Sequence, residues 1–194
     1  MVKKYDFRLG KWNKDDFFYV YSPACKAYKE FIQEDSCIVN SFDESIKDFD
    51  YISMVTKEKY THGVKISAKC SFEKFGAPLI VLTNDINKNH QGESIYGRHF
   101  EIVPYEKGCN VWKVEPAPEK LSRPIKSTAL AKMEFKVDAE SIIDLEVEVK
   151  QKSFLIKVND TVFEVENNEI PESFHVGITA CEGVNRFYEF AIKD

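Results

Sequence analysis

The chain lacks any long apolar segment. Residues 1–14 are charged throughout and contain no apolar stretch of the kind that a secretory signal needs. No later run approaches the roughly 20 apolar residues that a helix requires to cross a bilayer. From these two absences we expect no membrane partner and a cytoplasmic location.

Clusters of basic residues are also missing. The chain carries 27 Lys and Arg residues against 32 Asp and Glu residues, which gives a formal net charge of −5, and no basic block dominates a segment. Nucleic acids and anionic membrane surfaces are bound largely through clustered positive charge. Nucleic acid is therefore not an expected partner.

Motifs for cofactors and metals are absent as well. The sequence has no CxxC pair, no HExxH spacing among its 4 histidines, and neither a GxGxxG nor a Walker loop. We therefore predict no cofactor and no metal. The 5 cysteines are widely spread and are interpreted as reduced thiols in strands: Cys25, Cys37, Cys70, Cys109 and Cys181.

Helical periodicity is scarce. The only candidate helix is 22–31, where Ser22 could cap and Pro23 could occupy the first turn, although a strand and a loop fit equally well. The chain instead contains short runs rich in Val, Ile, Phe and Tyr, separated by polar clusters, which is typical of strands. The predicted strands are 51–56, 63–72, 78–83, 99–105, 110–115, 129–137, 141–150, 154–158, 161–166, 174–180 and 187–192.

The clearest pattern lies in 141–166. Apolar and charged residues alternate at the two-residue period of a strand from Ile143 to Lys150, so one face of this strand should be buried. Asn159-Asp160 tolerates positive φ and predicts a hairpin turn. The sequence therefore predicts a three-stranded meander, with the sequon at Asn159 serving as a turn and not as a glycan acceptor.

Many short antiparallel strands bury themselves by packing two sheets face to face or by closing a barrel. We predict an all-β fold, an antiparallel two-sheet β-sandwich with little helix, formed by residues 1–194 as one domain. The stretch 115–126, with prolines at 116, 118 and 124, is expected to be a long surface connection between the sheet halves. The first fifty residues could form an edge strand or a cap.

Three passages resemble the concanavalin A-like lectin and glucanase superfamily. They are 96–103, which opens with Tyr96-Gly97, the meander 143–165, and the pair 175–180 and 186–192. The resemblance implies a jelly-roll sandwich of two curved sheets. It also implies that ligands, where present, are sugars laid across the concave sheet or held by its rim loops.

One predicted face has the residue types of a sugar site. If a turn at 106–108 joins 99–105 to 110–115 as a hairpin, five side chains share a face: His99, Glu101, Tyr105, Asn110 and Trp112. A saccharide site needs an aromatic ring for stacking and fixed polar groups for hydroxyls. The alternative is that Tyr105 and Trp112 are ordinary core residues and that His99 and Glu101 form a structural pair.

Two other clusters have structural explanations. Glucanase-like relatives carry a Glu-x-Asp-x-Glu cluster, and the nearest pattern here is Asp144-x-Glu146-x-Glu148, which we interpret as a solvated strand face. The segment 85–89 resembles the first half of a calcium loop, but Gly92 and Tyr96 do not fit the rest of that loop, so a polar turn is favoured.

Three functions stay open at this point. The first is a noncatalytic lectin-like module that binds an oligosaccharide. The second is a glycoside hydrolase in which Glu101 acts with a sequence-distant carboxylate, the catalytic residues being otherwise unknown. The third is a structural or oligomerisation domain that uses an open sheet edge. The sequence does not determine the oligomeric state.

Overall fold

The computed structural model describes residues 1–21, 30–40, 51–117 and 125–194. Regular structure in these residues is almost entirely β, apart from the short 3-10 helix η1 (Lys14–Asp16). No helix in the described ranges is long and apolar enough to cross a membrane.

The strands fall into two groups in the chain. Before the central sheet they are β1 (Val2–Asp6), β2 (Phe17–Val20), β3 (Ile32–Gln33), β4 (Ile38–Val39), β5 (Tyr51–Thr56) and β6 (Tyr60–Thr61). From there on they are β7 (Lys65–Thr83), β8 (Ile86–Lys88), β9 (Ser94–Tyr96), β10 (His99–Tyr105), β11 (Gly108–Pro116), β12 (Ile125–Glu134), β13 (Ile143–Val149), β14 (Ser153–Val158), β15 (Thr161–Glu166) and β16 (Ser173–Lys193).

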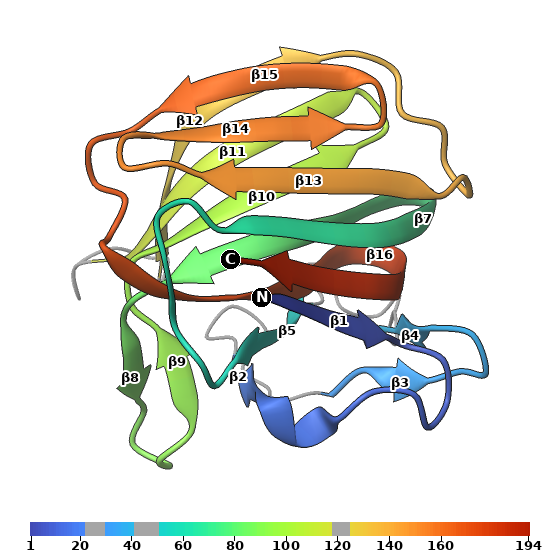
Figure 1. Ribbon diagram of the computed structural model, residues 1–194, viewed down its shortest axis with the longest axis horizontal. Coiled ribbons are helices and arrows are strands. Elements are labelled where there is room, and N and C mark those ends of the chain that lie inside the picture. The colour runs from blue at the N-terminus through green and yellow to red at the C-terminus, as the bar shows by residue number, and fades with distance from the viewer. Residues whose placement is uncertain (22–29, 41–50, 118–124) are drawn as a thin grey trace.

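Two long strands, β7 and β16, organise the fold. They pair antiparallel from Lys65 with Lys193 to Thr83 with His175, and each passes from one layer of the molecule to the other (Figure 1). Sheet one has the order β15-β14-β13-β7-β16-β1 and uses the first half of β7 and the second half of β16. Sheet two has the order β12-β11-β10-β7-β16-β5-β2 and uses the other halves.

The continuity of β7 and β16 corrects the sequence prediction, which divided each into two strands. The polar and Gly-containing positions that predicted breaks instead accommodate register shifts, at Cys181 to Val184 in β16 opposite Gly76 in β7. Glu182 and Gly183 take positive φ of 59° and 56° there. A bulge of this kind bends a strand without ending its ladder, so both strands can serve both sheets.

A buried pair of asparagines holds this bend. The Asn185 backbone N–H donates to Oδ1 of Asn40 at 2.7 Å, and Nδ2 of Asn40 donates to the Gly183 carbonyl at 2.8 Å. Both asparagines are buried. Because an irregular ladder leaves backbone groups unpaired, these side chains supply hydrogen bonds that the bend would otherwise lose.

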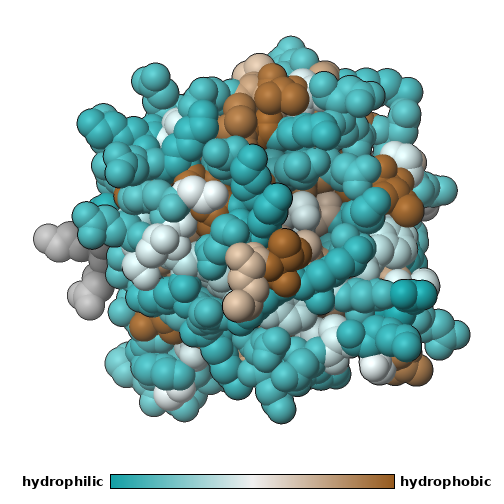
Figure 2. All heavy atoms as spheres, viewed as in Figure 1, coloured by the Kyte–Doolittle hydropathy of each residue, from teal (hydrophilic) through white to brown (hydrophobic). Residues whose placement is uncertain are grey.

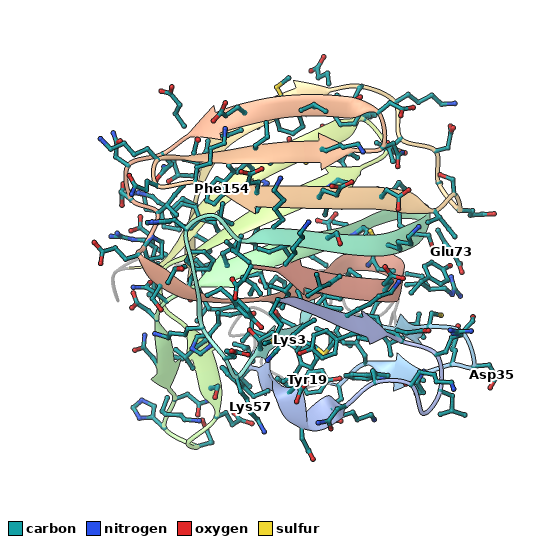
Figure 3. The ribbon with its side chains drawn as sticks, in the orientation of Figure 1. Lys3, Tyr19, Asp35, Lys57, Glu73 and Phe154 are labelled. Carbon is teal, nitrogen blue, oxygen red and sulfur yellow. The ribbon has the colours of Figure 1, made fainter. Side chains whose placement is uncertain are left out.

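The core lies between the two sheets, where alternating side chains of each strand meet. The side chains that fill it are almost fully buried, including Ile66, Leu145 and Val147 from sheet one and Ile80, Leu82, Phe100 and Val176 from sheet two. Phe154 of β14 (Figure 3) packs against Phe100 of β10 with ring centroids 5.3 Å apart, which joins the layers. The surface over β13–β15 is predominantly hydrophilic (Figure 2), as expected for the solvent side of such strands.

The predicted meander is confirmed as β13, β14 and β15. Asn159 has a φ of 52° in the hairpin turn, and its Oδ1 accepts a hydrogen bond from the Asp144 N–H at 2.9 Å. The turn interpretation of this residue is therefore confirmed.

Other predictions need correction or lie outside the described residues. The 115–126 stretch does not connect sheet halves, because the strands on either side of it, β11 and β12, are neighbours in sheet two. Residues 118–124 of this stretch lie outside the described ranges. Residues 22–29 of the candidate helix also lie outside them. The described part of the first fifty residues supplies edge strands to both sheets, β1 and β2. Cys37 precedes β4 and is not in a strand, whereas Cys70, Cys109 and Cys181 are in strands; Cys25 is outside the described ranges.

Candidate functional site

The face of sheet two that points away from the core brings together the residues predicted from the sequence. The β10–β11 hairpin forms as expected, and its register sets Glu101 opposite Trp112 and Val103 opposite Asn110. Since directly paired residues share a face and alternate positions repeat it, the outer face carries all five candidates. We refer to it below as the outer face of sheet two.

Much of this outer face is buried. Its own strands contribute a second apolar cluster, made of Val20, Val55, Ala77, Leu79, Val81 and Val103. Ile86 and Tyr96, from the β8–β9 hairpin, pack against the cluster, and so does Trp112 from β11. The hairpin therefore covers part of the face next to β2 and β5.

Glu101 lies in a compact polar network. Its Oε1 accepts a hydrogen bond from the Tyr51 hydroxyl at 2.5 Å and lies 3.3 Å from Nε2 of His99. Nδ1 of His99 lies 3.1 Å from the Gly97 carbonyl oxygen. A carbonyl only accepts, so Nδ1 of His99 is the donor in that contact.

The tyrosines of this network are held in their neutral state. Burial, and next the negative charge of Glu101, raises the pKa of Tyr51 well above its ordinary value. Burial also raises the pKa of Tyr96, whose hydroxyl bonds to Ser53 and whose ring packs on His99 with centroids 4.5 Å apart. Tyr51 therefore stays a hydrogen-bond donor to Glu101 over the ordinary pH range.

Four residues of this network were missed in the sequence, and one of them is Tyr96 of β9. Tyr51 and Ser53 come from β5, and Thr179, whose Oγ1 lies 2.5 Å from Oγ of Ser53, comes from β16. Their one signal was a polar side chain at every second position in an otherwise apolar strand, as in Tyr51 and Ser53. Their meeting depends on pairing between strands far apart in sequence, which that signal does not reveal.

A second group lies beside the first, toward β12. Oδ1 of Asn110 is buried and has no hydrogen-bond partner, although the side chain as a whole is partly exposed. Nζ of Lys132 lies 5.6 Å from the ring centroid of the partly exposed Trp112. Tyr105 lies at the far end of β10, opposite Gly108. The five candidates thus form a His99–Glu101 network, an Asn110–Trp112 group and a more distant Tyr105.

Carboxylates are sparse on this face. Among the described strand positions, the register places Glu134 there together with Glu101, because Glu134 pairs with Gly108, which pairs with Tyr105. Strand spacing of about 4.8 Å and a rise of about 3.3 Å per residue separate the two carboxylates by roughly 16 Å. Glycoside hydrolysis uses carboxyl groups about 5–9.5 Å apart, so these two do not form such a pair. The described residues also contain no group of three or more side chains suited to holding a metal ion.

The acidic run of β13 has the structural role that the sequence suggested. Asp144 pairs with Lys69 at 3.3 Å, Glu146 with Lys157 at 3.3 Å, and Glu148 with a lysine of β7, Lys65, at 3.0 Å. These ion pairs lie on the outer face of sheet one, where the lining of a hollow of about 630 Å³ includes the first two of them. The interpretation as a solvated strand face is confirmed.

The segment 85–89 enters the β8–β9 hairpin. Oδ1 of Asn89 accepts hydrogen bonds from the backbone N–H groups of Gln91 at 3.0 Å and Glu93 at 2.8 Å. The side chain thereby closes the turn at 89–93. The prediction of a polar turn at 85–89 is corrected, because Ile86–Lys88 form strand β8 and only Asn89 enters the turn.

Comparison with known proteins identifies the fold. No protein-family model matches the chain, and no curated protein matches it. Among solved structures, the carbohydrate-binding module CBM66 from Bacillus subtilis aligns with a TM-score of 0.61 at 8% identity, covering 89% of this chain and 91% of that one. The fold is a concanavalin A-like jelly roll.

Two further solved structures show the same similarity. A glycoside hydrolase family 16 endo-glucanase from Bacteroides ovatus aligns with a TM-score of 0.61 at 10% identity, covering 98% and 99% of the two chains. LamAcat from Zobellia galactanivorans aligns with a TM-score of 0.61 at 12% identity, covering 99% and 96%. The resemblance seen in the sequence is confirmed at the level of the fold, since identities this low carry no information on activity.

Proposed function

We propose that the protein is a noncatalytic carbohydrate-binding module whose ligand lies on the outer face of sheet two. The contact residues are those that this face brings together: His99, Glu101, Tyr105, Asn110 and Trp112. The observation that carries the proposal is the Asn110–Trp112 group, in which an aromatic ring lies beside a buried carbonyl that has no donor.

A saccharide supplies what this group lacks. The apolar face of a pyranose ring can stack on the Trp112 ring, and the partly exposed Asn110 side chain can turn so that its Oδ1 accepts a hydrogen bond from a ring hydroxyl. A buried hydrogen-bond acceptor without a partner lowers the stability of the free protein. A ligand that donates a hydrogen bond to it therefore binds more tightly. If the chain is cytoplasmic, as its sequence predicts, the ligand is an intracellular oligosaccharide.

The similar structures support the class of ligand. They include the module CBM66 and several glycoside hydrolases, among them a κ-carrageenase from Pseudoalteromonas carrageenovora solved with an oligotetrasaccharide of κ-carrageenan. The choice of a noncatalytic module follows from the roughly 16 Å between Glu101 and Glu134, which is too far for a hydrolytic pair.

One observation favours a competing function. The contact of Nε2 of His99 with Oε1 of Glu101 at 3.3 Å would orient Glu101 as the acid/base residue of a glycoside hydrolase. That enzyme would need a second carboxylate within about 9.5 Å, which the described strands do not supply.

Calorimetric titration with mono- and oligosaccharides, followed by analysis of each mixture for cleavage products, tests the proposal. The expected result is binding without cleavage, weakened but not abolished by Glu101→Gln. Glu146→Gln, which alters a carboxylate of the opposite face, serves as the matched control and should bind like the unaltered protein. Cleavage that Glu101→Gln abolishes would establish the hydrolase, and no binding across the panel would favour a structural or oligomerisation domain.

A further inference from the structure

Lys132 is the positively charged residue nearest to the Asn110–Trp112 group in the register. It lies on β12, the edge strand of sheet two, and pairs directly with Asn110. A bulge next to Trp112 shifts the register of β12, so that Lys132 shares the face of Asn110. Its Nζ lies 5.6 Å from the Trp112 ring centroid, within the range of a cation–π contact.

The ammonium group of Lys132 has no carboxylate partner within 4 Å among the described residues. Several other strand lysines have one, as Lys113 does with Glu169 at 2.8 Å and Lys157 with Glu146 at 3.3 Å. Glu134, two residues farther along the same face, makes no such pair with Lys132. An unpaired cation thus lies over the ring on which a sugar would stack.

We infer that the saccharide bound at Trp112 is acidic and carries a carboxylate or a sulfate that pairs with Lys132. The inference rests on the proposed function. A neutral sugar that stacks on Trp112 displaces the ammonium group of Lys132. The cation–π attraction between Lys132 and Trp112 is then lost, and the neutral sugar forms no ion pair that would replace it. An acidic sugar gives the displaced ammonium group an ion pair on the same side of the ring.

The neighbouring residues fix the direction of the acidic group. Glu101 lies opposite Trp112 on the β10 side, so an anion placed there meets like charge. Oδ1 of Asn110 can only accept a hydrogen bond, so it needs a sugar hydroxyl and not a carboxylate or a sulfate. The acidic group therefore points toward β12, and a hydroxyl of the same saccharide points toward Asn110.

Matched pairs of oligosaccharides test this inference. The probes are tetragalacturonate with its full methyl ester, and a κ-carrageenan tetrasaccharide with its desulfated form, each titrated by calorimetry at low salt and at 1 M NaCl. We expect the acidic member to bind about two- to fivefold more tightly at low salt, and the preference to vanish at 1 M, where charges are screened beyond about 3 Å. Lys132→Gln should remove the preference while leaving the affinity for the neutral member equal or higher.

Lys126→Gln is the matched control, because Lys126 is an exposed lysine of the same strand whose register position, opposite Glu115, lies before the bulge and on the other face. It should keep the preference of the unaltered protein. Equal binding of both members, or a preference that Lys132→Gln leaves intact, would overturn the inference and leave the carbohydrate-binding proposal standing. Absence of binding to all four probes, although another saccharide of the wider panel binds, would overturn the inference alone. Absence of binding across the whole panel would contradict the proposed function and the inference with it.

Discussion

The outer faces of the two sheets follow the same alternation of side chains but differ in composition and burial. On sheet one, the alternate positions of β13 carry carboxylates paired with lysines of neighbouring strands. On sheet two, the corresponding positions of β7 carry Leu79 and Val81, which are buried although they point away from the core. Its polar residues, Glu101 among them, bond to one another.

This difference separates a solvated surface from a surface built for contact. Exposed ion pairs contribute little energy and bind nothing in particular, because water satisfies them equally well. A partly buried aromatic ring beside an unpartnered carbonyl gains from a ligand what water does not provide. This contrast is the reason for proposing the binding site on sheet two, and three experiments on stability and one on binding test it.

The largest expected effect is an asymmetric response to pH. Burial raises the pKa of Cys37 to about 11 and of Cys109 to about 12, and it raises the pKa values of Tyr5, Tyr51 and Tyr60. The unfolded chain loses these protons first, from about pH 9 for thiols and pH 10 for phenols, so the folded state is destabilised as pH rises. Each group contributes about 1.4 kcal/mol per pH unit while it is ionised only in the unfolded chain.

The carboxylates on the outer face of sheet one should make stability depend much less on pH in the acid range. Glu164, on the outer face of sheet one, has a pKa lowered by the Ser153 hydroxyl and Lys150, so its contribution is lost only as pH falls below the ordinary range of a glutamate. The Glu164 side chain is 45% exposed, so solvent screens this interaction and the effect on stability is small. Denaturant unfolding from pH 3 to pH 11 should give a steep alkaline loss, made shallower by Tyr51→Phe. Of the groups with a raised pKa, Tyr51 lies on the outer face of sheet two, whereas Tyr5, Tyr60 and Cys109 lie in the core, so an alkaline slope that Tyr51→Phe leaves unchanged would contradict the contrast between the faces.

The next largest effect concerns Gly177 on the outer face of sheet two. A Cβ atom added there would lie 2.0 Å from the Met54 carbonyl oxygen and 2.7 Å from Cα of Val55, so β5 would have to move. We expect Gly177→Ala to lower the free energy of unfolding by roughly 1–3 kcal/mol. Thermal denaturation measures it, with Ser67→Ala on the outer face of sheet one as a control expected to stay within about 0.5 kcal/mol. Equal losses of stability at Gly177 and Ser67 would contradict the claim that the outer face of sheet two is more tightly packed than that of sheet one.

The smallest effect should come from the ion pairs of sheet one. Glu146 and Lys157 are both about half exposed, at 54% and 45% of their side chains. A double-mutant cycle with Glu146→Gln and Lys157→Gln should give a coupling of about 0.5 kcal/mol or less. A coupling of several kcal/mol would show that this face is more than a solvated surface.

The sequence predicted what depends on local pattern. Three strands match the predicted bounds, β5, β10 and β15, and the alternation in 99–105 and 110–115 correctly placed Glu101 and Trp112 on one face. A short hairpin with a Gly in its turn fixes such a register almost by itself.

What the sequence could not predict depends on partners far along the chain. Gly183 looked like the end of a strand, but the ladder with β7 continues past it. The partners of Glu101 and Trp112, Tyr51 and Lys132, are set by pairing between separate strands. Simple alternation from Ala129 would have put residue 131 on the outer face, and only the bulge brings Lys132 there.

The most direct test of the account uses the two tryptophans of the chain. Trp12 donates its indole N–H to Gln33 at 2.8 Å and packs on Phe7, away from the outer face of sheet two, so it is an internal control. In an NMR titration with a saccharide that binds in calorimetry, the account predicts that the indole N–H signal of Trp112 shifts with ligand concentration while that of Trp12 does not. Saturable binding that leaves the Trp112 signal unmoved, or that moves Trp12 instead, would contradict the placement of the site.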